Sequence, residues 1–388
     1  MTVLYIIDPG TVGGATKSFL EMVMLLKDYG ITPIVLTSRN NDINQLLTDK
    51  GIDSFAIGHT TVLTQLSSSI IKRPLSWVKQ YCIYHVRKIN SLKKVDRIIR
   101  ENKIDLIHTN SARNDIGCYI SKKYNIPHIM HIREFSDLDF GCVPLNFNYI
   151  KIYNTFTSCF ITISDAIKKH WEKKGILHNK MFTIYNGIHY QKISVSSDSS
   201  KENEKLKMVI VGGVYPTKGQ HLAVEAICNL PNTIRQNIFL DIIGWYSKEY
   251  VTQIKKIAEK YNILDHIKFL GKIDNVSELL GNYQIGLMCS KSEGFGRSTA
   301  EYMHAQLGVI ASNSGACPEL VEPDVCGQLF ESGNAKDLAC CIERYYNNRD
   351  LLIKHSHAAR KKAQNQYTDV TNAQNIYKLY KEVLHGVK

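Results

Sequence analysis

The chain has 388 residues, of which 44% are hydrophobic and 22% charged, so it is long enough for two or three domains and too apolar to be intrinsically disordered. Its net charge of +12 favours an anionic partner: nucleic acid, an anionic membrane face or a phosphorylated ligand. No apolar run reaches the ~18–20 residues that cross a bilayer, which argues against a membrane-spanning helix.

The first eight residues, Met1–Asp8, are apolar but lack the basic stretch and the cleavage site of an export signal. We expect a first strand here. The ten cysteines form no Cys-x-x-Cys pair and mostly have apolar neighbours, which indicates free thiols in a reducing compartment. Both features favour a cytoplasmic protein.

Short apolar runs alternate with amphipathic stretches through the first half of the chain, a pattern typical of a parallel sheet with helices on both faces. The expected strands are Val3–Ile7, Pro33–Leu36, Asp105–His108, His128–His131 and Cys159–Ile163. The expected helices are Thr16–Leu26, Val86–Arg100 and Asp165–Lys173.

A basic segment, residues 71–100, interrupts this pattern. Lysines and arginines mix there with aromatic residues, which suits a helix on an anionic membrane, such as the inner face of the plasma membrane. A solvated helix face is the alternative, and both interpretations stay open. The cations are Lys72, Arg73, Lys79, Arg87, Lys88, Lys93, Lys94, Arg97 and Arg100, and the aromatics are Trp77, Tyr81 and Tyr84.

The second half repeats the alternation after a polar, serine-rich stretch, Lys192–Lys207, which we interpret as a linker or an exposed loop. The expected strands are Met208–Val211, Phe239–Ile243, Ile267–Leu270, Ile285–Cys289 and Val309–Ser312. Helices are expected from Gly219, over Tyr250–Tyr261 and from Ser298. The predicted fold is α/β, with one doubly wound domain over 1–190, a linker over 191–207, a second domain over 208–370 and a final helix over 371–388. The two domains are expected to face each other across a cleft.

The strongest chemical signal is the segment Cys289–Glu301, in which a strand ends, a glycine-rich turn follows and a helix opens near Ser298. A helix N-terminus favours phosphate through its free N–H groups and its dipole. Gly294 and Gly296 let the backbone approach a ligand closely. Glu301, one turn into the helix, is placed to accept hydrogen bonds from vicinal hydroxyls. The alternative is a capped helix with charged residues.

This segment resembles the Glu-x7-Glu signature of the retaining family-4 glycosyltransferases, which have the GT-B fold. Further matches follow in the family's order along nearly the whole chain; each is weak alone, and together they are strong. They are Gly13-Gly14, Ile107–Ser111, His128–Phe135, Ile163-Ser164, Tyr185–Gly187, Val211–Gln220, Phe269–Ile273 and Ser314–Val321.

The resemblance implies a role for individual residues. Glu301 would bind the ribose hydroxyls of a nucleotide-sugar donor, Lys218 its diphosphate, and Glu293 the transferred sugar. His131 would reach the reacting sugar from the N-terminal half, with a structural histidine as the alternative. The catalytic set is therefore Glu293, His131 and Lys218. The donor-binding set is Gly13, Gly14, Gly244, Lys272, Ile273, Gly294, Phe295, Gly296, Arg297, Ser298 and Glu301.

Three positions depart from the family pattern. Gly213 stands where an arginine usually completes the diphosphate clamp, His189 where an aspartate is common, and Gln306-Leu-Gly308 where Gly-x-Pro is common. Arg297 is the nearest cation that could compensate for the missing arginine. Alternatively, Arg297 points to solvent.

Other site types fit less well. In the segment Gly10–Ser18, Thr16 stands before Lys17 where a P-loop needs glycine, and the glycine spacing does not match a dehydrogenase. Asp137-Leu-Asp139 resembles a metal-binding Asp-x-Asp but lies far from the expected diphosphate loop. We therefore expect no metal and no cofactor. A sugar-nucleotide epimerase on the same fold is the alternative function.

The resemblance implies transfer of a hexose-type sugar, with a UDP-sugar favoured, onto a glycan or lipid-linked acceptor in bacterial cell-surface polysaccharide synthesis. It implies retention of anomeric configuration, and we favour front-side attack through an oxocarbenium-like transition state. Binding to nucleic acid is not expected.

Overall fold

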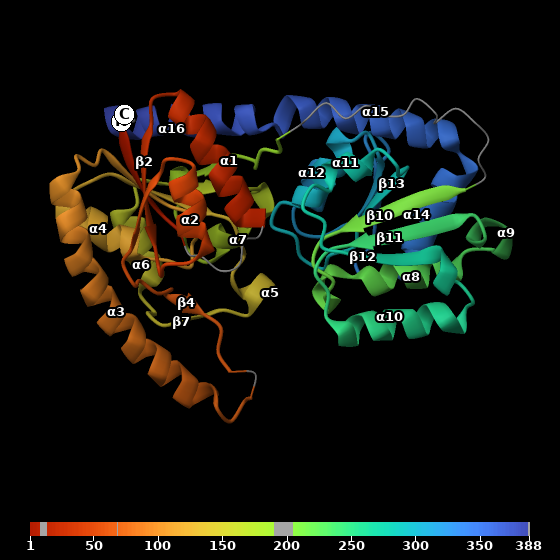
Figure 1. Cartoon of the computed structure of the whole chain (residues 1–388), viewed down its shortest axis with the longest axis horizontal. Helices are drawn as coiled ribbons and strands as arrows, with labels where there is room; N and C mark the ends of the chain where they lie inside the picture. The colour runs from red at the N-terminus through yellow and green to blue at the C-terminus, as the bar shows by residue number, and fades with distance from the viewer. Residues whose placement is uncertain (8–13, 68, 190–204, 387–388) are drawn as a thin grey trace. The chain divides into compact units, whose positions relative to one another are not determined.

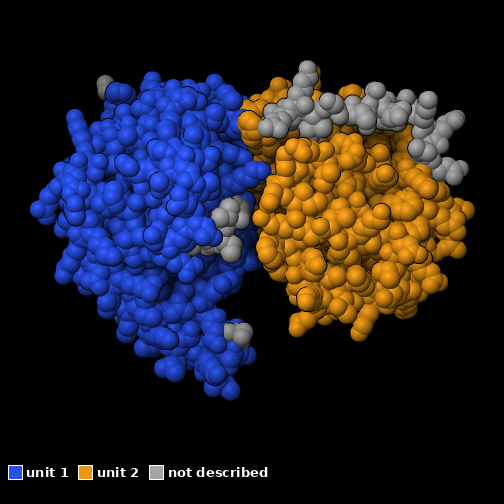
Figure 2. All heavy atoms as spheres, in the orientation of Figure 1, with its two compact units in different colours: residues 1–187, 369–388 blue, residues 188–368 orange. Residues whose placement is uncertain are grey.

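The structure is a computed structural model that describes residues 1–7, 14–67, 69–189 and 205–386. The chain forms two compact units: unit 1 comprises residues 1–187 and 369–388, and unit 2 comprises residues 188–368 (Figure 2). Gly13 and residues 191–204 of the predicted linker lie outside the described residues.

Unit 1 is built on a parallel sheet with seven strands in the order β3-β2-β1-β5-β6-β8-β9. Every residue of β5, β6 and β8 is buried, as expected for a parallel sheet that helices cover on both faces. The strand order reverses between β1 and β5, so the connections diverge there and leave a crevice at the carboxyl ends. The strands are β1 (Thr2–Ile6), β2 (Thr32–Thr37), β3 (Asp53–Ala56), β5 (Leu106–Thr109), β6 (His128–Ile132), β8 (Cys159–Thr162) and β9 (Met181–Thr183).

The helices of unit 1 include one from the far end of the sequence. Helix α16 (Asp369–His385) lies against α1 (Gly14–Asp28), and Ile376 and Leu379 join the same apolar core as Phe19 (Figure 1). The remaining elements are α2 (Asp42–Asp49), α3 (Arg73–Glu101), α4 (Ile116–Tyr124), α5 (Asp137–Phe140), α6 (Tyr149–Phe156), α7 (Asp165–Lys173), and the antiparallel pair β4 (Leu63–Thr64) and β7 (Val143–Pro144).

Unit 2 repeats the design with six parallel strands in the order β12-β11-β10-β13-β14-β15, and its switch point lies between β10 and β13. The strands are β10 (Leu206–Val211), β11 (Ile238–Ile243), β12 (Ile267–Gly271), β13 (Ile285–Met288), β14 (Gly308–Ser312) and β15 (Gln328–Phe330). The helices are α8 (Gln220–Asn229), α9 (Asn232–Arg235), α10 (Lys248–Lys260), α11 (Ser277–Leu280), α12 (Arg297–His304), α13 (Cys317–Leu320), α14 (Ala335–Asn347) and α15 (Arg349–Gln366).

Helix α3 differs from its sequence prediction. The apolar period predicted Val86–Arg100, but the helix extends over Arg73–Glu101. Tyr84 is its first buried residue, and the others, Ser91, Val95 and Ile98, lie in the second half, so the turns before Tyr84 carry no core-facing stripe for the period to reveal. Among the described helices, none combines the length and the hydropathy needed to span a bilayer.

Candidate active site

A small cavity of about 80 Å³ lies at the switch point of unit 2. The carboxyl end of β10 contributes Ile210–Gly212, and the end of β13 contributes Met288–Ser290. The remaining walls carry four of the predicted site residues together with Gln220: Lys218, Glu293, Arg297 and Ser298. The fold therefore gathers residues that are up to about 90 positions apart at the edge where parallel sheets bind ligands.

Helix α12 is fixed to the end of β10 by two hydrogen bonds. Ser298 Oγ donates to the carbonyl oxygen of Val211 at 2.9 Å, and the hydroxyl of Tyr302 accepts from the N–H of Val211 at 2.6 Å. Gly296, the N-cap residue, has φ of 85°, a left-handed conformation that glycine adopts without strain. The first turn of α12, with its positive dipole end, is thereby held beside the cavity.

Two cation–carboxylate pairs line this site. Lys218 Nζ lies 2.8 Å from Glu293 Oε2, and Arg297 Nε lies 3.1 Å from Glu301 Oε1. The Arg297 side chain is only 16% exposed, so it belongs to the site and does not project into solvent. Each cation thus has a neighbouring carboxylate, and an arriving diphosphate would share the cations with the two glutamates.

Gly213, where the family usually has arginine, lies directly against the ring of Tyr215. An added Cβ would lie 2.5 Å from Cε2 of Tyr215, so a larger residue requires the Tyr215 ring, which is 47% exposed, to move. At Gly244 an added Cβ would lie 1.9 Å from the carbonyl oxygen of Gly212. Gly244 therefore lets the turn after β11 pack against the turn after β10.

The other predicted donor residues lie outside the cavity. Lys272, exposed after β12, forms an ion pair with Asp274 at 2.6 Å, and Ile273 is half-buried beside it. Phe295 is buried, with its ring centroid 5.8 Å from that of Tyr367. Gly294 lies in the turn before α12, and Gly14, in unit 1, is the first residue of α1.

Gln220 is a cavity residue that the sequence prediction did not assign. Its side chain is fully buried, and Nε2 donates to the carbonyl oxygen of Gly213 at 3.0 Å. Its Oε1 has no hydrogen-bond partner among the residues that the structure describes. A buried acceptor of this kind requires a donor from a ligand or from water. Gln220 is the last residue of the segment Val211–Gln220 that resembles the family, but no role was assigned to it.

His131 lies in β6 of unit 1 and is completely buried, within a hydrogen-bonded chain. Its Nδ1 lies 3.3 Å from Nε2 of His108 and 3.3 Å from Nη2 of Arg133. His108 Nδ1 in turn lies 2.6 Å from the hydroxyl of Tyr380 on α16. Burial, aided by the charge of Arg133, holds the pKa of both histidines well below the ordinary value, so both rings are neutral.

These contacts fix the proton positions. A guanidinium can only donate, so Nδ1 of His131 carries no proton when it accepts from Arg133, and a proton on Nε2 of His108 supports the same arrangement. The ring proton therefore sits on Nε2, which has no partner among the described residues. His108 then donates from Nε2 and accepts at Nδ1 from Tyr380, whose single hydroxyl proton is shared with the hydroxyl oxygen of Tyr5 at 3.3 Å. The network makes His131 a hydrogen-bond donor at Nε2 and excludes that nitrogen as a base.

Arg133 is itself held in place. Its Nε donates to Oδ1 of Asn110, and its Nη1 donates to Oδ1 of Asn186, each at 2.7 Å. Arg133, Asn110 and Asn186 came from three separate segments quoted for the resemblance. Their meeting place shows that these segments act together around His131.

Asp137 and Asp139 each have local partners. Asp137 Oδ1 lies 2.8 Å from Nε2 of His170 and 2.9 Å from Nζ of Lys174. Asp139 Oδ2 accepts from the backbone N–H of Phe135 at 2.7 Å. Both carboxylates therefore serve the local structure around α5.

Comparisons with known proteins cover both units. The family model for "Glycosyltransferase Family 4" matches residues 12–192, and that for "Glycosyl transferases group 1" matches residues 192–366. The uncharacterized glycosyltransferase MJ1178 of Methanocaldococcus jannaschii is 28% identical over 267 residues, which cover 68% of this chain and 71% of that protein. The capsular polysaccharide biosynthesis glycosyltransferase CapH of Staphylococcus aureus is 22% identical over 234 residues, covering 59% of this chain and 65% of the relative.

A solved structure has the same fold over almost the whole chain. It is that of HepE from Anabaena in complex with UDP-glucose, with a TM-score of 0.76 and 21% identity. The superposition covers 98% of this chain and 100% of HepE. At this identity the likeness establishes the shared architecture.

Proposed function

The chain belongs to glycosyltransferase family 4 and is a glycosyltransferase with the GT-B fold, and on this premise we propose that it transfers a hexose-type sugar from a nucleoside diphosphate sugar to a glycan or lipid-linked acceptor. We favour uridine as the base, and the HepE complex with UDP-glucose supports this choice. The likeness to CapH supports a role in making a cell-surface polysaccharide.

The observation that carries the proposal is the clustering of Lys218 and Arg297 with the first turn of α12 at the switch point of unit 2. In glycosyl transfer, negative charge builds on the departing diphosphate. Cations and amides that are already fixed by Glu293, Glu301 and Val211 can meet this charge without reorganising, which is where electrostatic catalysis is usually largest. We assign them this role without a metal.

The stereochemical proposal is retention. The reacting sugar would lose its diphosphate on the same face that the acceptor hydroxyl attacks, and the leaving phosphate oxygen would take the acceptor's proton. The neutral His131, with its proton on Nε2, is not needed as a base in this scheme. Glu293, paired with Lys218, is assigned to the sugar hydroxyls.

Peripheral membrane attachment through α3 is part of the proposal. The start of α3 and the residues before it expose apolar side chains beside cations: Ile71 is 92% exposed and Leu75 is 75% exposed, next to Lys72 and Arg73. Two large aliphatic side chains that are this exposed argue against a merely solvated face, because contact between apolar side chains and water is unfavourable. A lipid interface accommodates both kinds of side chain.

The direct test is a thermal-shift screen of the full chain against nucleotide sugars. A ligand at ~100 times its Kd stabilises the folded protein by ~2.7 kcal/mol. The best donor is then incubated with and without candidate acceptors. Nucleotide released only with an acceptor supports transfer, whereas a changed sugar without acceptor identifies an epimerase. Proton NMR of the early product reads the anomeric configuration, and an inverted linkage contradicts retention.

A further inference from the structure

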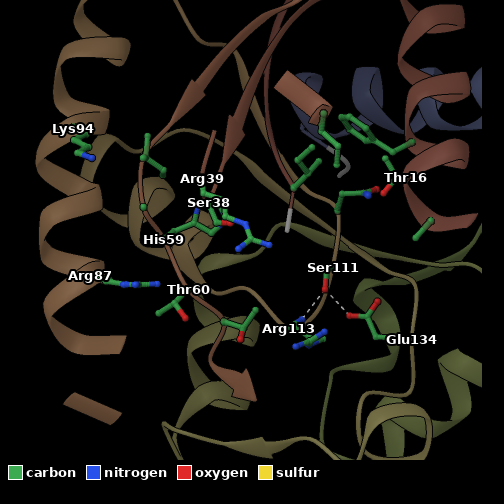
Figure 3. Close-up of a pocket in the computed structure, with 18 of the residues that line it drawn as sticks. Thr16, Ser38, Arg39, His59, Thr60, Arg87, Lys94, Ser111, Arg113 and Glu134 are labelled. Carbon is green, nitrogen blue, oxygen red and sulfur yellow. Dashed lines mark hydrogen bonds between the residues drawn. The ribbon is translucent and has the colours of Figure 1, made fainter. Parts of the chain in front are cut away.

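Unit 1 contains a pocket of about 890 Å³ at the carboxyl edge of its sheet, around the switch point between β1 and β5. Its walls come from the residues that follow these strands, from the loops after β2 and β3, and from α1 and α3 (Figure 3). The volume lies in the range of small-molecule sites. Of the described residues that were assigned to the donor, none lines this pocket, although Gly14 immediately precedes the lining residues Ala15 and Thr16 of α1.

The charge of this pocket is strongly positive. Among the residues that the structure describes, four cationic side chains line it, Arg39, Arg87, Lys94 and Arg113, against one carboxylate, that of Glu134 (Figure 3). No residue in the described part of the chain forms an ion pair with Arg39, Arg87 or Lys94. Unpaired cations that converge on one concave space favour an anion there, and arginine is suited to phosphate.

The single carboxylate does not cancel this field. Glu134 is buried and accepts a hydrogen bond from Ser111 Oγ at 2.6 Å. Burial raises the pKa of Glu134, although the bond from Ser111 and the charge of Arg113 oppose the shift. The carboxylate is thus tied to one wall, beside Arg113. The three other cations are exposed at the pocket and have no counter-charge within the described ranges.

His59 supplies a second, independent sign of a ligand. Its side chain is 2% exposed, it lines the pocket, and neither ring nitrogen has a hydrogen-bond partner in the described ranges. Burial lowers the pKa of His59 to about 4, and the polar backbone of Ile7 opposes this shift without meeting the geometry of a hydrogen bond. A neutral imidazole with an unpaired donor and an unpaired acceptor requires a polar partner, which sugar hydroxyls or phosphate oxygens provide.

Helix α3 connects this pocket to the exposed apolar segment described above. Arg87 and Lys94 of the pocket lie on the same helix as Leu75. Twelve residues separate Leu75 from Arg87, which is ~18 Å along a helix. A phosphate bound at Arg87 therefore lies within reach of a lipid chain that is anchored at the start of the helix.

We propose that this pocket binds the phosphate or diphosphate of a phosphorylated acceptor, with Arg39, Arg87 and Lys94 as its cations and His59 as a hydrogen-bonding partner. That the ligand is an acceptor rests on the proposed function, whereas the assignment of a phosphate-binding site does not. The shared chemistry is a phosphate ester, which either a lipid-linked diphosphate or a soluble sugar phosphate would supply.

The test measures binding of two probes to the full chain, farnesyl diphosphate and glucose 1-phosphate, by isothermal titration in saturating UDP. The UDP occupies the donor site and leaves the pocket as the anion site under study. We expect at least one probe to bind, with an affinity that falls as salt is added. Binding of glucose 1-phosphate supports a soluble source, and binding of farnesyl diphosphate alone supports a lipid-linked one.

The variants use a neighbouring pair on α3. Lys94→Gln and Arg87→Gln each remove a pocket cation and should weaken binding about tenfold, as expected for a charge-assisted hydrogen bond. Lys93→Gln, at an exposed neighbour outside the pocket, should change affinity less than twofold. Thermal unfolding of each variant checks that the fold is kept.

Two outcomes overturn the inference: neither probe binds although UDP does, or Lys93→Gln weakens binding as much as Lys94→Gln. The first leaves the proposed function intact, because UDP still binds. Conversely, a chain that binds a probe at the pocket but no nucleotide at all keeps this inference and refutes the proposed function.

Discussion

At the residue scale, the donor site is organised by shared cations. Lys218 and Arg297 are each held by a carboxylate before any ligand arrives. A diphosphate then competes with Glu293 and Glu301 for the same cations. Since the side chains are already ordered, little conformational entropy remains to be lost when the donor binds.

Removing either cation should damage turnover more than folding. Lys218→Ala and Arg297→Ala should each lower kcat by ~10²–10³, the usual cost of losing a main charge-stabilising donor. Steady-state kinetics with a saturating donor measures this effect. Lys256→Ala is the matched control, because Lys256 is an exposed residue of α10 that does not line the cavity and has no assigned role. A normal kcat for Arg297→Ala with an inactive Lys218→Ala would mean that the lysine acts alone.

Restoring the family's arginine at position 213 should require a second change. Because an added Cβ at Gly213 meets the Tyr215 ring at 2.5 Å, Gly213→Arg alone should rescue the Arg297→Ala variant poorly. Combining Gly213→Arg with Tyr215→Ala removes the obstacle, and we expect kcat to recover by at least tenfold. Equal rescue with and without Tyr215→Ala would show that the ring moves aside at little cost.

The proton on His131 should depend on a residue almost 250 positions away. Tyr380→Phe removes the hydroxyl that donates to His108 Nδ1, so His108 is free to change tautomer and the Nε2 proton of His131 is no longer fixed. Nitrogen-15 NMR of the ring nitrogens should show a single Nε2–H tautomer in the wild type and a mixture in Tyr380→Phe.

A control for this experiment lies on the same helix. Tyr377→Phe removes a hydroxyl from a half-buried ring that stacks near Tyr29, away from His108, and should leave the tautomer unchanged. If Tyr380→Phe also retains pure Nε2–H, Arg133 alone fixes the ring, and the role assigned to α16 is wrong.

The sequence predicts which residues lie together where a motif is contiguous, whereas their roles stay predictions. Glu293, Arg297 and Ser298 belong to one segment, so spacing alone placed them together. Gln220 and His59 went unassigned, because a buried polar atom without a partner becomes visible only when the surrounding fold is known. The tautomer of His131 likewise depends on Tyr380, which no local pattern connects to it.

At the element scale, the strands of the two sheets were predictable because each buried strand is a short apolar run. Strands β10 and β11 begin within two residues of their predicted starts. Strand β3 was missed because its residues are half-buried or exposed, so it carries no apolar signal. Helix α3 was predicted too short for the opposite reason: its first turns expose apolar residues where a core-facing stripe was sought.

The start of α3 should bind membranes through both charge and apolar insertion. Ile71→Ser combined with Leu75→Ser removes two exposed aliphatic groups that are each worth ~1.5–3 kcal/mol when buried. We expect at least a tenfold loss of binding to phosphatidylglycerol vesicles in a sedimentation assay. Val86→Ser, at an exposed residue farther along the helix, should matter less.

Charge reversal separates the two contributions. Glutamate at Lys72, Arg73, Lys93 and Lys94 should also release the protein, by about 1 kcal/mol for each basic residue near the surface. If the wild-type protein does not bind anionic vesicles at low salt, the exposed residues of α3 do not attach the protein to a membrane.

At the scale of the whole molecule, the two units share a strand order but differ in what they bury. Each has its candidate site at the switch point of a parallel sheet. Unit 1 buries four histidines whose side chains are almost inaccessible to water, His59, His108, His128 and His131, whereas the buried histidines of unit 2 are His304 and His355 among the described residues. The alternation of strands and helices predicted the sheets, but the pocket of unit 1 could not be foreseen, because its cations come from separate loops and a helix.

The buried histidines should make unit 1 sensitive to acid. Burial lowers the pKa of His59 to about 4 and that of His128 to about 3, and holds those of His108 and His131 well below normal. In the unfolded chain each titrates near 6.5. As the pH falls below 6.5, these histidines therefore bind protons in the unfolded state but stay neutral in the folded state, and the free energy of unfolding decreases.

By pH 5 this linkage should remove about 2 kcal/mol for each such histidine. Asp115, whose pKa burial raises to about 6, acts in the opposite direction and offsets about 1 kcal/mol, because its folded form binds a proton first. The net expectation is a unit 1 that loses several kcal/mol between pH 7.5 and pH 5.

Tryptophan fluorescence can follow unit 1 alone in the intact chain. The three tryptophans are Trp77 and Trp171 in unit 1 and Trp245 in unit 2, so Trp245→Phe confines the signal to unit 1. Urea unfolding of this variant should give a free energy of unfolding that is several kcal/mol lower at pH 5 than at pH 7.5. Adding His59→Gln should reduce the difference in the free energy of unfolding between pH 7.5 and pH 5 by about 2 kcal/mol. This holds even if the substitution itself destabilises unit 1 equally at both pH values. An unchanged difference would mean that His59 takes up a proton in the folded state, which requires an anion or a water molecule in its pocket.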